Sequence, residues 1–288
     1  MKLSKLIDNY LDNLEKNKGR TKKTIKNYQF YLSRFVDFFG NKKPEKINTE
    51  IIKKYKKWLD NLIDVHGESL KKNTQNYHLI ALRNFLKYLK QTDSQTFSYQ
   101  DIKLQPSKLN KPSVLSESEI ESLLNSPLHV KKTGKNDNLI NHRDKALLEL
   151  LYCTGLLVSE ISDLKKSDID LNKNGFTLKS KNHAQKTVSL SQQAKYWIKQ
   201  YLNLRNDSNS YLFISHDKRT GKITIDGITP RTVQRIVNKC AKIAGINKNI
   251  TPHSLRHSYT LSMIKSGVNT SQIKQLLGIK NDNSKRYA

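Results

Sequence analysis

One short run of the chain combines side chains that suit phosphate binding: Thr251-Pro252-His253-Ser254-Leu255-Arg256-His257. Thr251 can cap a helix and Pro252 fits its first turn, so the run predicts a helix that begins here. His253, Arg256 and His257 are then three and four residues apart and share one face of that helix. A guanidinium and an imidazole beside the partly positive end of a helix suit a phosphate group.

The charge balance of the chain indicates where such a phosphate belongs. Lys and Arg number 52 against 25 Asp and Glu, which gives 288 residues a formal net charge of +27. This surplus attracts polyanions and makes their binding fall steeply with salt. The alternative is a merely basic soluble protein from an AT-rich genome, which explains the excess of Lys over Arg but does not remove the charge. Nucleic acid is favoured, and RNA is disfavoured because the sequence shows neither a glycine-rich nucleic-acid loop nor strands with exposed aromatic residues.

The first hundred residues are predicted to be helical. Apolar residues recur at helical spacing over residues 3–14 and 25–39, and in later segments that begin near Thr49, which can cap its helix, and near Lys72. Four amphipathic helices with short connections predict a compact bundle. Lysines cluster on the polar faces, where they either face solvent or contact phosphates: Lys22, Lys23, Lys26, Lys71 and Lys72.

A linker and a second domain follow the bundle. Helical periodicity fades between Thr92 and Pro112, where polar residues and prolines favour an extended linker. Ser116 and Glu119 then form a capping box, a surface loop is expected over residues 127–140, and a strong helix over 143–153. Further helices are expected at 158–164, 191–204 with Ser191 as its cap, 229–245, 251–267 and 269–277. Short strands are expected at 168–171, 175–178, 187–190 and 211–214.

The cysteines and the N-terminal sequence indicate the cellular compartment of the protein. Cys153 and Cys240 both lie in apolar helical patterns, so they are predicted to be free thiols of the core, as in a reducing cytoplasm. The N-terminus leads directly into an amphipathic pattern, and no apolar run has the length of a bilayer span. We therefore expect a cytoplasmic protein, associated with the nucleoid, that has no membrane partner.

Four blocks of sequence complete the pattern around the phosphate site. They are residues 150–161 (LLYCTGLLVSEI) followed by Asp168-Ile169-Asp170, the turn Lys179-Ser180-Lys181, the run 251–257, and Leu276-Leu277-Gly278 followed by Lys285-Arg286-Tyr287-Ala288. In this order and spacing the blocks resemble the tyrosine recombinases of the phage-integrase family, of Xer type. The resemblance covers nearly the whole chain and implies a mainly α fold. A helical, SAM-like core-binding bundle (1–100) and a linker (101–114) would precede a mixed α+β catalytic domain with a small antiparallel sheet (115–288).

The resemblance also implies a chemistry that uses no metal, nucleotide or other cofactor. A tyrosine hydroxyl attacks a DNA phosphate, forms a 3′-phosphotyrosyl link and frees a 5′-hydroxyl. Tyr287 corresponds to that nucleophile, and Arg256 to an arginine that grips the phosphate. His253 corresponds to a donor or acid/base helper at the same phosphate, and Lys181 to the general acid for the 5′-oxygen. The implied partner is double-stranded DNA, bound by a homo- or hetero-tetramer.

The residue types by themselves leave structural alternatives open at each of these positions. Tyr287 can be an exposed tail tyrosine, Arg256 a partner in a surface salt bridge, His253 a helix-capping histidine and Lys181 a solvated lysine. His257 is expected to pack in support of the site.

The chain departs from the family pattern in three places. Leu157 stands where the family has its first phosphate-binding arginine, and a leucine side chain neither donates a hydrogen bond nor carries charge. Ile279 stands where the family has histidine or tryptophan, and the segment from Gly278 to Tyr287 is one residue shorter than usual. Arg143 or Lys280 is a candidate substitute for the missing donor. The alternative hypothesis is therefore a catalytically inactive DNA-binding protein, or a silent partner in a mixed tetramer.

Overall fold

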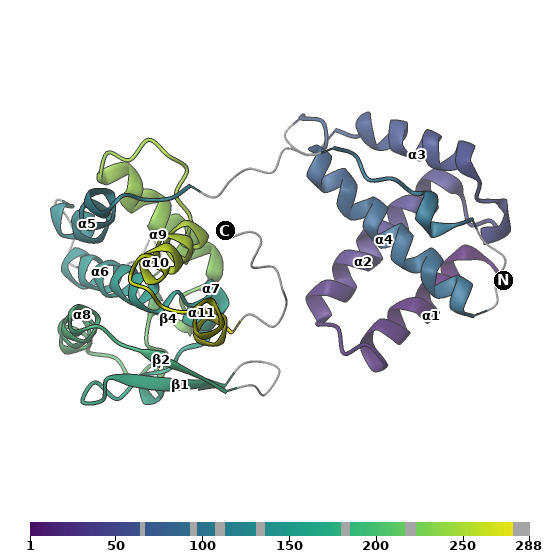
Figure 1. The fold of residues 1–288 in the computed structure, drawn as a ribbon. Coiled ribbons are helices and arrows are strands. Elements are labelled where there is room, and N and C mark those ends of the chain that lie inside the picture. The colour runs from purple at the N-terminus through teal and green to yellow at the C-terminus, as the bar shows by residue number, and fades with distance from the viewer. Residues whose placement is uncertain are drawn as a thin grey trace. The chain divides into compact units, whose positions relative to one another are not determined.

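The computed structural model describes residues 1–63, 67–92, 97–106, 113–130, 136–179, 185–216 and 223–278. The chain divides into two compact units, Met1–Asn110 (the N-terminal unit) and Lys111–Ala288 (the C-terminal unit), shown in Figure 1. Each unit buries an apolar cluster of its own. Helices dominate both units and the strands are short, so the predicted mainly α class with small antiparallel sheets is confirmed.

The N-terminal unit is a helical bundle. Its elements are α1 (Leu3–Lys16), α2 (Lys22–Phe39), η1 (Pro44–Lys46), α3 (Thr49–Asp60), α4 (Lys72–Gln91) and η2 (Tyr99–Asp101). The α4 helix packs against α1, α2 and α3, and its Leu82 and Phe85 side chains are fully buried. The cap of α3 is Asn48 rather than the expected Thr49, because the Asn48 Oδ1 accepts from the backbone N–H of Ile51 at 2.9 Å.

The C-terminal unit combines helices with two small antiparallel hairpins. Its elements are α5 (Glu117–Asn125), η3 (Ser126–His129), α6 (Asp137–Thr154), α7 (Val158–Asp163), η4 (Lys166–Asp168), β1 (Gly175–Lys179), β2 (Gln185–Ser189), α8 (Gln192–Asn203), β3 (Ile214–His216), β4 (Ile223–Gly227), α9 (Pro230–Ile243), α10 (Pro252–Lys265) and α11 (Thr270–Leu277). The first hairpin pairs β1 with β2, and the second pairs β3 with β4.

The α6 helix is the centre of the C-terminal unit and packs against α8, α10 and η3 (Figure 1). Every residue from Arg143 to Leu151 is buried, so all faces of this stretch of the helix are covered, as expected of an interior helix. Both predicted core cysteines are free, and burial raises the pKa of the Cys240 thiol to about 11.

Two of the predicted strands are wrong or displaced. Residues 168–171 form no strand, because the Asp168 Oδ2 accepts from the backbone N–H of Lys165 at 2.8 Å and closes a 3-10 turn instead. The strand predicted at 211–214 begins only at Ile214. The carbonyls of Tyr211 and Leu212 are occupied by the Arg205 guanidinium, at 2.7 and 2.8 Å.

Two further boundaries differ from the prediction. The α6 helix begins at Asp137, six residues before the predicted start, within the segment expected to be a loop. Leu139 in this added turn packs against the core, which accounts for the longer helix. The β4 strand was not predicted, and the first predicted hairpin is found with its strands shifted by one or two residues at their ends.

Candidate phosphate-binding site

The helix that carries the phosphate motif begins where its sequence predicts. Thr251 is the cap of α10, and its Oγ1 accepts from the backbone N–H of Ser254 at 3.3 Å. Ser254 returns the interaction, because its Oγ accepts from the backbone N–H of Thr251 at 3.2 Å. Pro252 occupies the first turn, where the missing N–H costs the helix nothing. The start of α10 is therefore determined by local hydrogen bonds.

The Arg256 side chain joins three of the four sequence blocks. Its Nη1 donates to the carbonyl oxygen of Gly155, and its Nη2 donates to the carbonyl oxygen of Leu277 at 2.8 Å. Arg256 is only 7% exposed, so the guanidinium is held between the ends of α6 and α11. These contacts bring together parts of the chain that lie 101 and 21 residues away from Arg256.

Helix ends supply the oxygens that hold Arg256. Gly155 and Gly278 terminate α6 and α11 with φ angles of 58° and 66°, a left-handed conformation that favours glycine. The last carbonyls of a helix lack intrahelical donors, and a guanidinium can satisfy them. Gly155 is also a point of close approach, because an added Cβ would lie 2.9 Å from both Leu277 and Tyr259.

The two histidines of the motif differ in exposure. His253 lies in the first turn of α10 and is exposed, whereas His257 is buried at 8% exposure. Burial lowers the pKa of His257, which favours its neutral form. The predicted supporting position of His257 in the packing agrees with this burial, while the role of His253 at a phosphate stays a prediction.

Leu157, at the position of the absent arginine, begins α7 with its side chain 38% exposed. Its backbone N–H donates to the Glu160 Oε2 at 2.7 Å. The same carboxylate forms an ion pair with Lys186 on β2, with Nζ to Oε1 at 2.7 Å. The Lys186 side chain is only 8% exposed, and its Cδ lies 3.6 Å from the position of a Cβ built on Gly278. The aliphatic part of the Lys186 side chain therefore lies beside the turn whose carbonyl holds Arg256, and its ammonium group lies at the Glu160 carboxylate.

Two of the four predicted site residues lie outside the described residues. Lys181 belongs to segment 180–184 between β1 and β2, and Tyr287 belongs to segment 279–288, which also holds Ile279 and Lys280. The convergence of Lys181, His253, Arg256 and Tyr287 on one phosphate therefore stays a prediction.

Arg143, the other candidate substitute for the missing arginine, has a different environment. It is buried, it pairs with Asp144 at 2.7 Å, and it donates to the carbonyl of Ile214 at 3.2 Å. Arg143 thus holds β3 against α6. The buried pair of Lys186 and Glu160 was not predicted, because nothing distinguishes one lysine from its many neighbours in so basic a chain. The one available signal was Glu160, a carboxylate three residues after Leu157.

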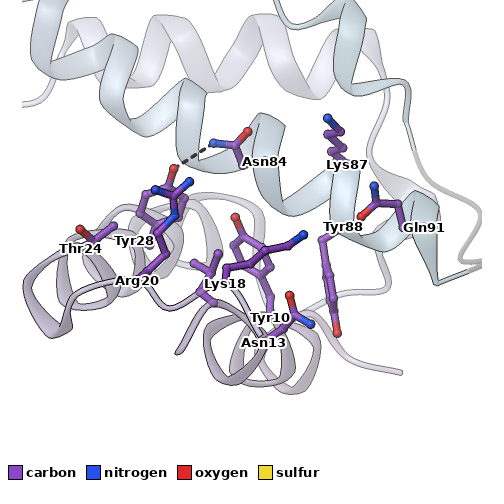
Figure 2. Close-up of a pocket in the computed structure, with 11 residues that line it drawn as sticks. Tyr10, Asn13, Lys18, Arg20, Thr24, Tyr28, Asn84, Lys87, Tyr88 and Gln91 are labelled. Atoms are coloured by element: carbon purple, nitrogen blue, oxygen red, sulfur yellow. Dashed lines mark hydrogen bonds between the residues drawn. The ribbon is translucent and has the colours of Figure 1, made fainter. Parts of the chain in front are cut away.

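A second cationic feature lies in the N-terminal unit. A cavity between α1, α2 and α4 is bordered by the cations Lys18, Arg20 and Lys87 and by tyrosine rings (Figure 2). The Tyr28 hydroxyl accepts from the Asn84 Nδ2 at 2.9 Å. Burial raises the pKa of Tyr10 in the same cavity. Positive charge therefore borders one hollow of the bundle.

The lysines that the sequence singled out in this unit are exposed. Lys22, Lys23 and Lys26 lie on α2, and Lys71 and Lys72 lie at the start of α4. Lys72 forms an ion pair with Asp60, whereas the role of the whole group at phosphates stays a prediction.

Two features are absent from the described ranges. They contain no helix with the length and apolar character needed to cross a membrane. Within the same ranges, no group of three or more His, Cys, Asp or Glu side chains is arranged to hold a metal ion.

Comparisons with known proteins agree with the resemblance. The Phage integrase family matches residues 113–288, and the phage integrase N-terminal SAM-like domain matches residues 7–93. The tyrosine recombinase XerC of Thermodesulfovibrio yellowstonii is 31% identical over 94% of this chain and 87% of its own length. The tyrosine recombinase XerA of Pyrococcus horikoshii is 31% identical over 91% of this chain and 81% of its own.

A solved structure shares the fold. The lambda integrase tetramer bound to a Holliday junction is 16% identical to this chain. The two structures match with a TM-score of 0.72 over 100% of this chain and 78% of the integrase chain. Together with the family matches over both units, these relatives show that the chain belongs to the phage integrase family of tyrosine recombinases, with relatives of Xer type.

Proposed function

We propose that this chain is a site-specific DNA recombinase that cuts and rejoins strands through a 3′-phosphotyrosine intermediate. The observation that carries the proposal is the position of Arg256, held by the carbonyls of Gly155 and Leu277 at the meeting point of three family blocks. A fixed guanidinium suits the charge that develops on phosphate oxygens during transfer. The family relationship supplies the reaction, and the net charge of +27 supplies attraction to DNA.

The proposed step balances without a cofactor. The Tyr287 hydroxyl gives its proton to His253, acting as the base, and its oxygen forms a bond to phosphorus while the bond from phosphorus to the 5′-oxygen breaks. Lys181 donates a proton to the leaving 5′-oxygen, and Arg256 holds the non-bridging oxygens. A 5′-hydroxyl of the partner strand then attacks the phosphotyrosine and reverses the step. Because the bond energy is retained in the intermediate, no nucleotide is consumed.

The proposal also covers the assembly and the role of each domain. Residues 1–100 bind double-stranded DNA, residues 101–114 connect the two domains, and residues 115–288 carry out cleavage and rejoining. The lambda integrase relative is a tetramer on a Holliday junction, which supports a tetramer of this chain, alone or with a related partner, on its own DNA in the nucleoid of the cytoplasm.

Leu157 favours a second candidate, a DNA-binding relative that does not cleave. Phosphoryl transfer depends strongly on arginines at the phosphate, and a single one contributes about 10³–10⁵ in rate. A leucine at this position removes that contribution. In this alternative the chain occupies a recombination site or joins a tetramer in which another subunit cleaves.

One experiment separates the two candidates. A preferred duplex is first selected from a randomised library by binding to the full chain. That duplex is then nicked close to the cleavage position, so that the released 5′ fragment diffuses away and traps the covalent intermediate. A protein–DNA adduct that disappears in Tyr287→Phe supports the recombinase. Tight binding without an adduct supports the silent binder, and absence of duplex binding at low salt contradicts both.

A further inference from the structure

We propose that Lys186 provides the phosphate-binding N–H donor that Leu157 cannot provide. The inference rests on the proposed function and names a residue outside the family's motif blocks. Lys186 lies on β2, far in sequence from both α7 and α11, yet it contacts the starting turn of α7 and the end of α11.

The first argument concerns the carboxylate of Glu160. Its Oε2 accepts from the backbone N–H of Leu157 at 2.7 Å, which places the carboxylate beside the backbone of the residue where the family carries its arginine. Here no guanidinium extends from residue 157, and the carboxylate binds the Lys186 ammonium at 2.7 and 2.9 Å instead. A cation is thus retained beside residue 157, but it comes from another element of the chain.

The second argument concerns Arg256. The Arg256 Nη2 donates to the carbonyl of Leu277, and the Lys186 side chain lies against Gly278, the next residue. Arg256 and Lys186 therefore flank the same turn at the end of α11. The Glu160 carboxylate balances the charge of Lys186, so the net positive charge beside this turn comes from Arg256, and Lys186 adds an N–H donor that suits a non-bridging phosphate oxygen.

The third argument concerns the cost of burial. A lysine side chain with 8% exposure loses most of its hydration, and an ion pair alone often only offsets that loss. An ammonium group has more N–H donors than the two carboxylate contacts use, so one remains to meet a phosphate oxygen. Lys186 is a point charge rather than a bidentate fork, which predicts weaker catalysis than an arginine would give.

The test measures single-turnover cleavage of the selected, nicked duplex by the full chain. Lys186→Met is expected to lower the rate about 10²-fold, the usual effect of removing one fixed donor to the developing charge. Adding Leu157→Arg to Lys186→Met is expected to restore most of that loss. Lys173→Met is the matched control, because it removes a lysine of the same unit that is 76% exposed, and it should leave the rate unchanged.

A purely structural role of Lys186 is tested separately. Removing the lysine leaves the Glu160 carboxylate unpaired, so the double variant Lys186→Met, Glu160→Gln removes both charges together. Its unfolding temperature should stay near that of the parent while its cleavage rate stays about 10²-fold low. Parent-like cleavage by either variant overturns the inference, and so does a rate loss that Leu157→Arg fails to restore.

A crystallographic arm distinguishes failure of the inference from failure of the proposed function. Crystals of the full chain are soaked in orthovanadate, a phosphate analogue that needs no cleavage to bind. An oxyanion in contact with both Arg256 and the Lys186 Nζ supports the inference even if the parent forms no adduct with DNA. An oxyanion bound by Arg256 without Lys186, or no bound oxyanion at all, overturns it.

Discussion

The two units of the chain place their charges differently. In the described part of the N-terminal unit, Lys, Arg, Asp and Glu side chains all keep solvent contact, and the core is built from leucine and aromatic residues. The C-terminal unit instead buries charged side chains: Arg143, Asp144, Lys145, Glu149, Arg205 and Arg256. Buried charges demand fixed partners. The N-terminal unit is thus built to present charge to a partner, and the C-terminal unit is built to hold charged groups in defined positions.

Two ion pairs make this contrast measurable. Lys145 and Glu149 on α6 are one helical turn apart with Nζ to Oε1 at 2.6 Å and with side chains 4% and 8% exposed. Glu50 and Lys54 on α3 have the same spacing, at 2.7 Å, but are 70% and 64% exposed. The spacing is the same, the order of the two charges along the helix is reversed, and the solvation differs.

The largest effect on stability is expected from breaking the buried ion pair of Lys145 and Glu149. Glu149→Gln leaves the Lys145 ammonium buried without its carboxylate, which should lower the free energy of unfolding by about 3–5 kcal/mol. Glu50→Gln should change the denaturation midpoint by no resolvable amount, because water and salt screen that pair. Chemical denaturation of the full chain checks both. Equal shifts for the two variants would contradict the contrast.

A smaller loss of stability is expected from substitution of Gly155, the glycine whose carbonyl accepts from Arg256. Gly155→Ala introduces a Cβ at a φ of 58° and within 2.9 Å of Leu277 and Tyr259, which should cost about 1–3 kcal/mol. The carbonyl that accepts from Arg256 should move as well, so cleavage should fall more than binding does. Gly245→Ala is the matched control, because its φ is also positive but its Cβ would meet open space. A variant with parent-like stability and cleavage would argue against a tight contact at Gly155.

The pH dependence of stability gives a third test. Burial, assisted by the charge of Arg143, lowers the pKa of His216 from 6.5 to about 4. The unfolded chain therefore binds this proton between about pH 6.5 and 4 and the folded chain does not, so stability is lost as the pH falls through that window. His216→Asn should flatten the fall in unfolding temperature between pH 7 and 5. An unchanged slope would show that other groups govern acid unfolding.

The smallest effect concerns the charged cavity of the N-terminal unit. If Arg20 and Lys87 contact DNA phosphates, each alanine variant should reduce the slope of log affinity against log salt by about 0.9. Cleavage by bound protein at saturating duplex should be unaffected. Fluorescence anisotropy over a range of salt concentrations checks this, and an unchanged slope would remove the cavity from the proposed DNA surface.

Local signals in the sequence predicted many of the helices. Contacts between residues that are far apart in the sequence could not be predicted from those signals. The caps Ser116, Ser191 and Thr251 are found as predicted, because each cap bonds to an N–H only three residues away. Strand 168–171 failed for the same local reason, since Asp168 bonds to a neighbouring N–H in place of a strand partner.

The site itself was only partly predictable. The motif indicated Arg256, but its acceptors lie 101 and 21 residues away, and only the folded chain pairs them. Lys186 carried no signal, because its significance depends on burial beside Glu160 and not on its neighbours in sequence.

The central claim is that Arg256 is held in place for phosphate chemistry rather than for stability alone. Arg205 is the matched control, since it is also buried and also donates to backbone carbonyls, those of Tyr211 and Leu212. The deciding measurement is the single-turnover cleavage rate and the duplex Kd of Arg256→Ala and Arg205→Ala in the same preparations. Arg256→Ala should lose about 10³-fold or more in rate with little change in Kd, and Arg205→Ala should lose stability but keep its rate. Parent-like cleavage by Arg256→Ala, or equal rate losses in the two variants, would contradict the account.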